Sequence, residues 1–251
     1  MQLWTVRDPL DADLNGTLRR LAEIGYQEVE PAGAAGTTVR EMAAALKRHN
    51  LAAPALHASY ERLRADFRSV LDEASLLGAR FLVCPWVDPG DRATAGDWRR
   101  VCQTLNGIGA AMRQHGFTLA YHHHDFEFVP FKEGITPFDL MMTETDARDL
   151  KLELDVYWLA RSGLDPVRSL ERAHDRVQLV HLKDLAADGS TTELGRGVLD
   201  FERIIRAARR LGVKHLFVEQ DSSTDPLASV ATSFRFLEGL SPDVRPQPPS
   251  R

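Results

Sequence analysis

The stretch "FTLAYHH" (117–123) has the composition of a short buried β-strand that ends in polar residues. An amphipathic segment before it predicts a helix over 95–114, and Gly116 separates the two. A polar loop follows, and then a short helix is predicted near 137–146. A strand set between helices in this way is typical of the βα units of a parallel sheet.

The same rhythm runs along the whole chain. Seven more short runs are predicted as strands: "QLWTV" (2–6), "QEVE" (27–30), "APALHA" (53–58), "RFLVCP" (80–85), "LKLELD" (150–155), "VQLVHLK" (177–183) and "KHLFVEQ" (214–220). The other predicted helices cover 13–24, 37–49, 61–77, 165–174, 200–211 and 226–238. Eight strand–helix units in 251 residues predict an α/β fold, a single-domain (β/α)8 TIM barrel. An open doubly wound sheet is the alternative, but no GxGxxG or GxxxxGK[ST] motif follows a strand.

The composition is that of one large globular domain. Hydrophobic residues make up 43% of the chain, which suits a single barrel. The barrel is predicted over 1–240, followed by a proline-rich tail over 241–251 that we expect to be disordered. The two cysteines, Cys84 and Cys102, lack CxxC spacing, which argues against a disulfide scaffold and a thiolate zinc site.

Charge and hydropathy limit the classes of partner. The net charge is −5 and the pI is about 6.0, so we expect no nucleic-acid partner. No run approaches the ~20 apolar residues of a membrane span, so we expect no membrane partner. The N-terminus lacks a charged segment followed by an apolar one, so no signal peptide is predicted and a cytoplasmic location is expected.

Polar residues gather at the ends of the predicted strands, where TIM barrels place their chemistry. These residues are Glu30, His57, Trp86, His122 to His124, Asp155, His181, Lys183 and Glu219. Side chains alternate along a strand, so His122 and His124 share the face of the small residue Ala120. His123 shares the bulky face of Tyr121, which should pack on the helices. The alternation therefore predicts His122 and His124 as site residues and His123 as a packing residue.

Asp155, His181 and Glu219 end the last three predicted strands. Carboxylate and imidazole ligands suit one divalent ion such as Mn²⁺, Mg²⁺, Co²⁺ or Zn²⁺. A fourth ligand should come from His122 or from Glu127 in the following loop, and the sequence leaves both open. The alternative is that Asp155 and Glu219 pair with Lys or Arg at the barrel rim.

Two carboxylates fit this pattern less simply. Strict alternation puts Glu153 on the face of Asp155, and Glu28 on the face of Glu30. A buried carboxylate is costly unless it is paired. Either a bulge shifts the register, or partners such as Lys151 satisfy these groups.

Several blocks in this order resemble the sugar phosphate isomerase/epimerase family, the xylose isomerase-like TIM barrels. They are "LWTVRD", "GYQEVE", "YHHHDFEF" (121–128), "LELDVYWLARSGLDPV", "VHLKD", "ELGRGVLDF" and "VEQD". The resemblance covers most of the chain and implies a divalent metal held by Glu, Asp, His and Glu from strand ends. Asp155, His181 and Glu219 match three of these ligands. His122 stands where the first Glu is expected, so we predict Glu127 as the fourth ligand and keep His122 as its rival.

Such a site implies a metal-dependent isomerase or epimerase that acts on a sugar, keto-sugar or cyclitol. The bound metal would polarise a carbonyl, and a carboxylate would remove the neighbouring proton to give a metal-stabilised enediolate. Glu219 is the first candidate for this base, with Glu127 or His124 as the opposing acid/base. Loss of a β-hydroxyl from the same intermediate would make the protein a lyase, which is the alternative.

The remaining residues at the predicted mouth are candidates for binding a small-molecule carbohydrate. They are Glu30, His57, Trp86, His122, Trp158, Lys183 and Arg196. For Lys183 and Arg196 the alternative is a solvated rim residue, and for the two tryptophans it is packing. An endonuclease-type hydrolase and a non-catalytic sugar-binding protein are further alternatives for the whole chain, and a homo-oligomer is compatible with the fold.

Overall fold

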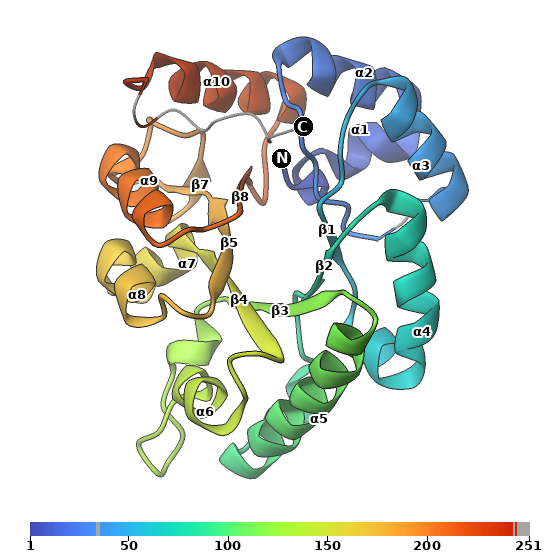
Figure 1. Cartoon of the computed structure of the whole chain (residues 1–251). Coiled ribbons are helices and arrows are strands. Elements are labelled where there is room, and N and C mark those ends of the chain that lie inside the picture. Colours follow the sequence, from blue (N-terminus) through green and yellow to red (C-terminus); the bar gives the residue numbers. More distant parts are fainter. Residues whose placement is uncertain (34–35, 243, 245–251) are drawn as a thin grey trace.

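A computed structural model describes residues 1–33, 36–242 and 244. Six parallel strands form one curled sheet in the order β1-β2-β3-β4-β5-β8. Their bounds are Ala55–His57 (β1), Phe81–Cys84 (β2), Thr118–His122 (β3), Leu150–Asp155 (β4), Val177–Leu182 (β5) and His215–Val218 (β8). Figure 1 shows the strands around a central axis with the helices outside them. The predicted single-domain TIM barrel is confirmed.

Two isolated bridges close the ring between β8 and β1. Gln2 bridges Glu30, and Glu28 bridges Ala52, both in the parallel sense. The backbone N–H of Gln2 also donates to the carbonyl of Val218 in β8 at 2.9 Å. The predicted second strand, 27–30, is thereby reduced to bridging residues, although it keeps its place in the barrel.

The prediction of a strand over 2–6 is wrong beyond Gln2. Leu3–Val6 form a 3₁₀ helix, η1, which leads into helix α1 (Arg7–Ala12). The side chain of Gln2 accepts the backbone N–H of Trp4 at 3.0 Å. This local hydrogen bond turns the chain out of the sheet immediately after the bridge. The β-branched and aromatic residues of this segment resemble a strand, but after Leu3 the chain turns, and the backbone N–H of Thr5 donates to the carbonyl of Gln2.

The helices that the sequence predicts are present. They are α2 (Leu14–Ile24), α3 (Val39–Arg48), α4 (Tyr60–Leu77), α5 (Ala95–Gln114), α6 (Pro137–Glu144), α8 (Pro166–Arg172), α9 (Phe201–Arg210) and α10 (Pro226–Gly239). Besides η1 and α1, the elements that the sequence did not predict are α7 (Val156–Arg161), the short helices η2 (Pro89–Asp91) and η3 (Phe126–Phe128), and a hairpin of β6 (Asp184–Leu185) and β7 (Thr191–Thr192). Among the described residues, no helix combines the length and apolar character that a membrane crossing requires.

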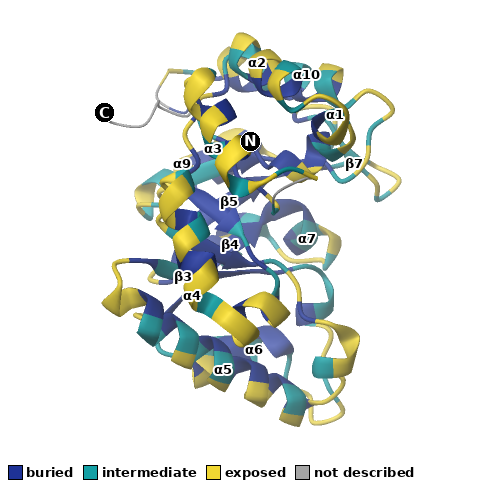
Figure 2. Ribbon diagram, turned by 90° about the vertical axis from the view of Figure 1, so that its right-hand side faces the viewer, coloured by how far each residue is buried: buried dark blue, intermediate teal, exposed yellow. Residues whose placement is uncertain are grey.

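Two apolar regions lie on opposite faces of the sheet. The larger one fills the space between strands and helices, and Figure 2 shows buried strands beneath helices whose outer faces are exposed. The smaller one lies inside the barrel, and we call it the apolar layer: Ala55, Val83, Ala120, Leu179 and Phe217. The tail that the sequence predicts to be disordered spans 241–251, and of these residues 243 and 245–251 lie outside the described part of the chain. Val244, within that tail, is buried.

Candidate active site

Four of the five residues of the apolar layer are followed two positions later by a polar residue, and Val83 is followed by Pro85. His57, His122, His181 and Glu219 follow Ala55, Ala120, Leu179 and Phe217 in this way. Since side chains alternate along a strand, these groups project into the same interior, closer to the carboxyl ends of the strands. The predicted split of the triple histidine has the same origin. Ala120 lies in the apolar layer, whereas Tyr121 belongs to the outer core.

Four residues, which we call the Asp155 group, could hold a metal ion: His122, Asp155, His181 and Glu219. One ligand atom from each lies within 4.8 Å of those of the other three, and all four residues are buried. Asp155 Oδ1 accepts the backbone N–H groups of Tyr157 and Trp158 at 2.8 and 3.2 Å and so caps α7. Asp155 Oδ2 and His122 Nδ1 are buried without a hydrogen-bond partner. Both atoms are therefore available to a ligand.

Lys183 lies beside the carboxylates of this group. Its Nζ is 3.3 Å from Glu219 Oε2, 3.5 Å from Asp155 Oδ2 and 2.6 Å from Asp221 Oδ1. Burial would lower the pKa of Lys183, but the carboxylates of Glu219, Asp155 and Asp221 override it and raise that pKa above its usual range. Lys183 is only 1% exposed, so it is a buried ammonium and not a solvated rim lysine.

The protonation of the two carboxylates differs. Burial opposes ionisation of Glu219, but Lys183 and His181 hold the pKa of its carboxyl well below the usual range. Burial raises the pKa of Asp155 to about 7, and Lys183 opposes that shift. For these carboxylates the sequence left pairing with Lys or Arg at the barrel rim as the alternative, and both do contact a lysine, but inside the barrel.

A second set, the Glu153 group, lies next to the first: Glu30, His57, Glu153 and His181. His57 Nε2 lies 3.0 Å from Glu153 Oε2, so a histidine pairs the carboxylate that strict alternation had left unexplained. Lys151 is not its partner, because Lys151 Nζ donates to the carbonyl of Asp175. The β4–β5 register also shifts between Leu152 and Glu153.

Glu28, the other carboxylate that strict alternation left unexplained, is also paired with a histidine. His215 Nδ1 lies 2.8 Å from Glu28 Oε2. Both acidic residues therefore meet histidines that come from distant strands. Their partners could not be chosen from neighbouring positions in the sequence.

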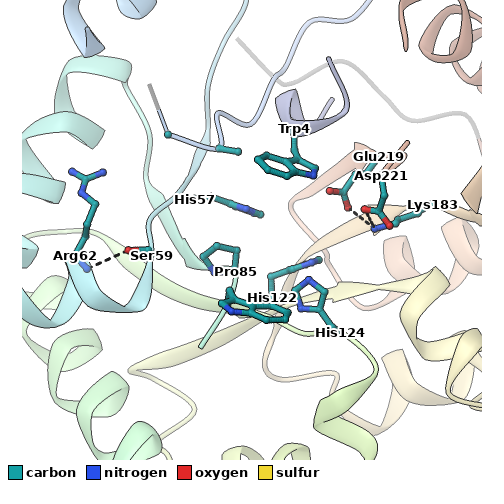
Figure 3. Close-up of a pocket in the computed structure, with 13 residues that line it drawn as sticks. Trp4, His57, Ser59, Arg62, Pro85, His122, His124, Lys183, Glu219 and Asp221 are labelled. Carbon is teal, nitrogen blue, oxygen red and sulfur yellow. Dashed lines mark hydrogen bonds and ion pairs between the residues drawn. The ribbon is translucent and has the colours of Figure 1, made fainter. Parts of the chain in front are cut away.

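A cavity of about 540 Å³ opens beside these groups (Figure 3). It is lined by Trp4, Ala32, Gly33, His57, Ser59, Arg62, Pro85, Trp86, His122, His124, Lys183, Glu219 and Asp221. In Figure 3, Glu219, Asp221 and Lys183 lie together on one side, next to His122 and His124. Trp4 and Trp86 are 47% and 41% exposed. Arg7 lies over the Trp4 ring and Arg92 over the Trp86 ring, so part of each ring remains open to a substrate.

His124 and Glu127 occupy different environments. His124 lines the cavity, and burial together with Lys183 lowers the pKa of its imidazole to about 3. The Glu127 carboxylate accepts the hydroxyl of Tyr121 at 2.6 Å and the backbone N–H of His124 at 2.7 Å. Burial raises the pKa of Glu127 to about 7. Glu127 therefore faces Tyr121 on the helix side and orients His124, while His122 stands in the Asp155 group.

The other predicted residues divide between the cavity and its surroundings. His123 packs on Phe128 and Phe138, and its Nε2 accepts the backbone N–H of Asp155 at 3.2 Å. Trp158 lies behind the cavity lining, with its ring 5.1 Å from Lys183 Nζ. Arg196 is largely exposed and pairs with Glu193 at 3.5 Å, away from the residues that line the cavity.

Sequence reasoning missed four polar or aromatic cavity residues: Trp4, Ser59, Arg62 and Asp221. Asp221 could have been found, since it stands two positions after Glu219 and shares its face. Trp4 was hidden by the predicted strand over 2–6. Ser59 and Arg62 belong to the start of α4, where Ser59 accepts the backbone N–H of Arg62 at 3.3 Å, a pattern that indicates only a helix cap.

Residues 18–240 match the family model described as the xylose isomerase-like TIM barrel. The chain belongs to this family. Among solved structures of such barrels, a sugar phosphate isomerase/epimerase from Parabacteroides distasonis superposes with a TM-score of 0.85. It is 24% identical, and the match covers 97% of this chain and 98% of that one. The L-ribulose 3-epimerase structure gives a TM-score of 0.70 at 17% identity, over 90% of this chain and 88% of the other. Both likenesses support the fold alone.

Curated relatives of this xylose isomerase-like barrel are enzymes. An inosose dehydratase of Lacticaseibacillus casei is 28% identical over 214 residues, which cover 71% of this chain and 71% of the relative. One of Geobacillus thermodenitrificans is 28% identical over 170 residues, covering 61% of this chain. The match spans only 55% of the length of that relative. The predicted family and the prediction of an enzyme are confirmed.

Proposed function

We propose that the protein is a metal-dependent dehydratase of a keto-cyclitol or keto-sugar. It would remove the proton next to the keto group and expel the β-hydroxyl as water. The observation that carries the proposal is the Asp155 group, in which two buried donor atoms lack a hydrogen bond, beside the Glu219–Lys183 pair at the cavity. The curated relatives named above are inosose dehydratases, which favours the lyase alternative over the isomerase that the sequence analysis preferred.

The donor set fits a divalent cation. Two carboxylates and two imidazoles are oxygen and nitrogen ligands of the kind that Mn²⁺, Co²⁺ and Zn²⁺ accept. Asp155 Oδ2 and His122 Nδ1 are buried without a hydrogen bond, and their nearest charged neighbours are Lys183 Nζ at 3.5 Å and Glu153 Oε2 at 3.6 Å, so a cation could engage both atoms. We propose His122, Asp155, His181 and Glu219 as the ligands, with His122 in the place predicted for Glu127. Lewis-acid polarisation of the substrate carbonyl is the chemistry that a bound cation supplies.

Glu219 is the proposed base. It lines the cavity and is ionised at neutral pH because its carboxyl pKa is lowered. A carboxylate of low pKa is a weak base, so the reaction depends on a polarised carbonyl that acidifies the neighbouring C–H. The C–H proton passes to Glu219 and then to the leaving β-hydroxyl, so one C–H and one C–O bond break and one water departs.

Lys183 and His124 complete the proposed machinery. The Lys183 ammonium lies 3.3 Å from Glu219 Oε2 and can donate to an oxyanion that develops beside that carboxylate. His124 is a neutral imidazole with an unpartnered buried Nδ1, so it can bind a substrate hydroxyl or pass a proton. The aromatic faces of Trp4 and Trp86 suit the C–H surface of a cyclitol or sugar ring.

The test is turnover of a keto-inositol in D₂O by the Mn²⁺-loaded protein, followed by mass spectrometry. A dehydratase gives a product that has lost one water and absorbs as a conjugated enone. Loading is checked by metal analysis, and Glu219→Gln serves as the matched inactive variant. If the loaded protein releases water from none of the keto-cyclitols and keto-sugars tested, the proposal is contradicted.

An isomerase or epimerase is the second candidate. Glu219 after β8 and His124 after β3 line the same cavity, and groups in two positions could serve the two faces of an enediolate. This activity would incorporate one solvent deuterium into a recovered isomer or epimer without loss of water. The same experiment therefore separates the two reactions.

A further inference from the structure

The Glu153 group takes no part in the proposed reaction except through His181. Its members are Glu30, His57, Glu153 and His181, whose ligand atoms lie within 4.8 Å of one another. We propose that this group binds a second divalent cation, so that the chain holds a dinuclear centre in which His181 faces both sites. This second site adds an ion to the centre of the proposed function, and His181 is the one residue that belongs to both groups.

The distances within the group suit tetrahedral coordination. A tetrahedral zinc ion with bonds of about 2.0–2.1 Å has its ligand atoms roughly 3.3 Å apart. Each histidine Nε2 lies near both carboxylates. His57 is 3.2 Å from Glu30 and 3.0 Å from Glu153, and His181 is 2.8 and 3.2 Å from the same two. Four of the six distances between donor atoms are therefore close to ligand spacing, and the other two are within 4.8 Å.

Unpartnered buried oxygens point to an ion as well. Glu30 Oε1 and Glu153 Oε1 have no hydrogen-bond partner, and both residues are fully buried. Leaving such atoms without a partner is costly, whereas a cation with a bidentate or bridging carboxylate would engage them. Gln2 Nε2 donates to Glu30 Oε2 at 2.7 Å, the kind of support that orients a metal-ligating carboxylate.

His181 is the link between the two groups. Its Nδ1 lies 2.8 Å from Glu219 Oε2, and its Nε2 lies 2.8 Å from Glu30 Oε2. One ring thus presents a nitrogen to each group. If both nitrogens bind cations, the ring loses both N–H protons to solvent and becomes a bridging imidazolate.

The ligands come from well-anchored parts of the barrel. Glu30 bridges to Gln2, His57 ends β1, and Glu153 and His181 lie in β4 and β5. Groups held on rigid strands keep their spacing when the ion leaves, so a second ion should bind without refolding. Without a metal, the same carboxylates would be paired with protonated imidazoles, and this is the competing account.

The test counts metal ions. The full chain is stripped with a chelator, loaded with excess Zn²⁺ or Co²⁺, desalted and analysed by plasma mass spectrometry. We expect two ions per chain for the wild type and one for Glu153→Gln, which keeps the shape but removes a ligand charge. Asp155→Asn is the matched variant of the other site and should also retain one. With Co²⁺, each variant should lose a different part of the visible absorption.

Two results would overturn the proposal: one ion per wild-type chain, or two ions retained by Glu153→Gln. Circular dichroism checks folding, and if Glu153→Gln does not fold, the wild-type count and Glu30→Gln decide. The outcome is independent of turnover. A count of two without turnover of any keto-cyclitol or keto-sugar tested would contradict only the proposed function, whereas turnover with a count of one would contradict only the second site.

Discussion

The apolar layer and the polar residues that follow it both lie in the barrel interior, two residues apart along each strand. Phe217 and Glu219 both follow the inward face of β8, yet Phe217 packs on apolar side chains and Glu219 meets Lys183 and His181. Ala120 and His122 show the same contrast on β3. A rise of two residues therefore separates a packing layer, which should provide stability, from a layer that should provide chemistry.

The energetics of the two layers also differ. Apolar burial stabilises the fold in proportion to the area removed from water. Buried carboxylates and imidazoles lose hydration and recover it only through pairing, so they contribute little net stability. Substitutions in the apolar layer should thus reduce stability. Substitutions of the polar residues two positions further along the strands should mainly reduce activity.

The largest effect is expected for Glu219→Gln. Loss of the proposed base should lower kcat/KM for a keto-inositol by about a thousandfold or more, equivalent to ~4 kcal/mol of transition-state stabilisation. The amide keeps the volume and can still accept from Lys183, so the protein should stay folded. Steady-state kinetics and a thermal melt test this together. Activity within tenfold of the wild type would remove Glu219 from the mechanism.

Phe217→Ala, two positions before Glu219, should lower the stability of the fold and leave the metal site intact. Truncating a fully buried phenylalanine leaves a cavity and should lower the free energy of unfolding by about 3–5 kcal/mol. Urea denaturation followed by circular dichroism gives the value. Metal content per folded chain should not change. A loss below ~1 kcal/mol, or a loss of metal without loss of stability, would break the distinction between the layers.

Glu127→Gln removes a buried carboxyl on the helix side of the sheet, where it contacts Tyr121. Burial raises the pKa of Glu127 from 4.5 to about 7, so between these values the folded state binds a proton that the unfolded state has released. Stability from this group is therefore lost as the pH rises from 4.5 through 7. Glutamine can donate to Tyr121 and accept from His124, so the variant should gain roughly 1–3 kcal/mol at pH 8.

The comparison is the free energy of unfolding at pH 5 and pH 8. The gain of Glu127→Gln over wild type should be present at pH 8 and nearly absent at pH 5. Asp125→Asn, a partly exposed carboxyl change in the same loop, is the matched control. An equal effect of Glu127→Gln at both values would contradict the assignment.

Trp86→Ala at the cavity mouth should have the smallest effect. The ring is 41% exposed and touches His124 and Phe126 edge-on. Its loss should raise KM about three- to tenfold through lost ring contact, roughly 1 kcal/mol, and change stability by less than that. Unchanged KM would assign Trp86 to packing, the alternative that the sequence left open.

Much of the fold and part of the site follow from local patterns. Apolar runs alternating with amphipathic helices predict the barrel, and each strand end then indicates where chemistry lies. Alternation separates His123 from His122, because it depends only on the strand period. The failure at 2–6 is also local, since Gln2 caps a turn that residue composition does not distinguish from a strand.

The sequence by itself determined which residues reach the barrel interior, because strand order and alternation act over a few residues. Only the tertiary structure decided which of them meet. His57 and Glu153 are 96 residues apart, and Glu30 and His181 are 151 apart. Pairings of this kind depend on how the closed ring sets its strands side by side, and no local period encodes that.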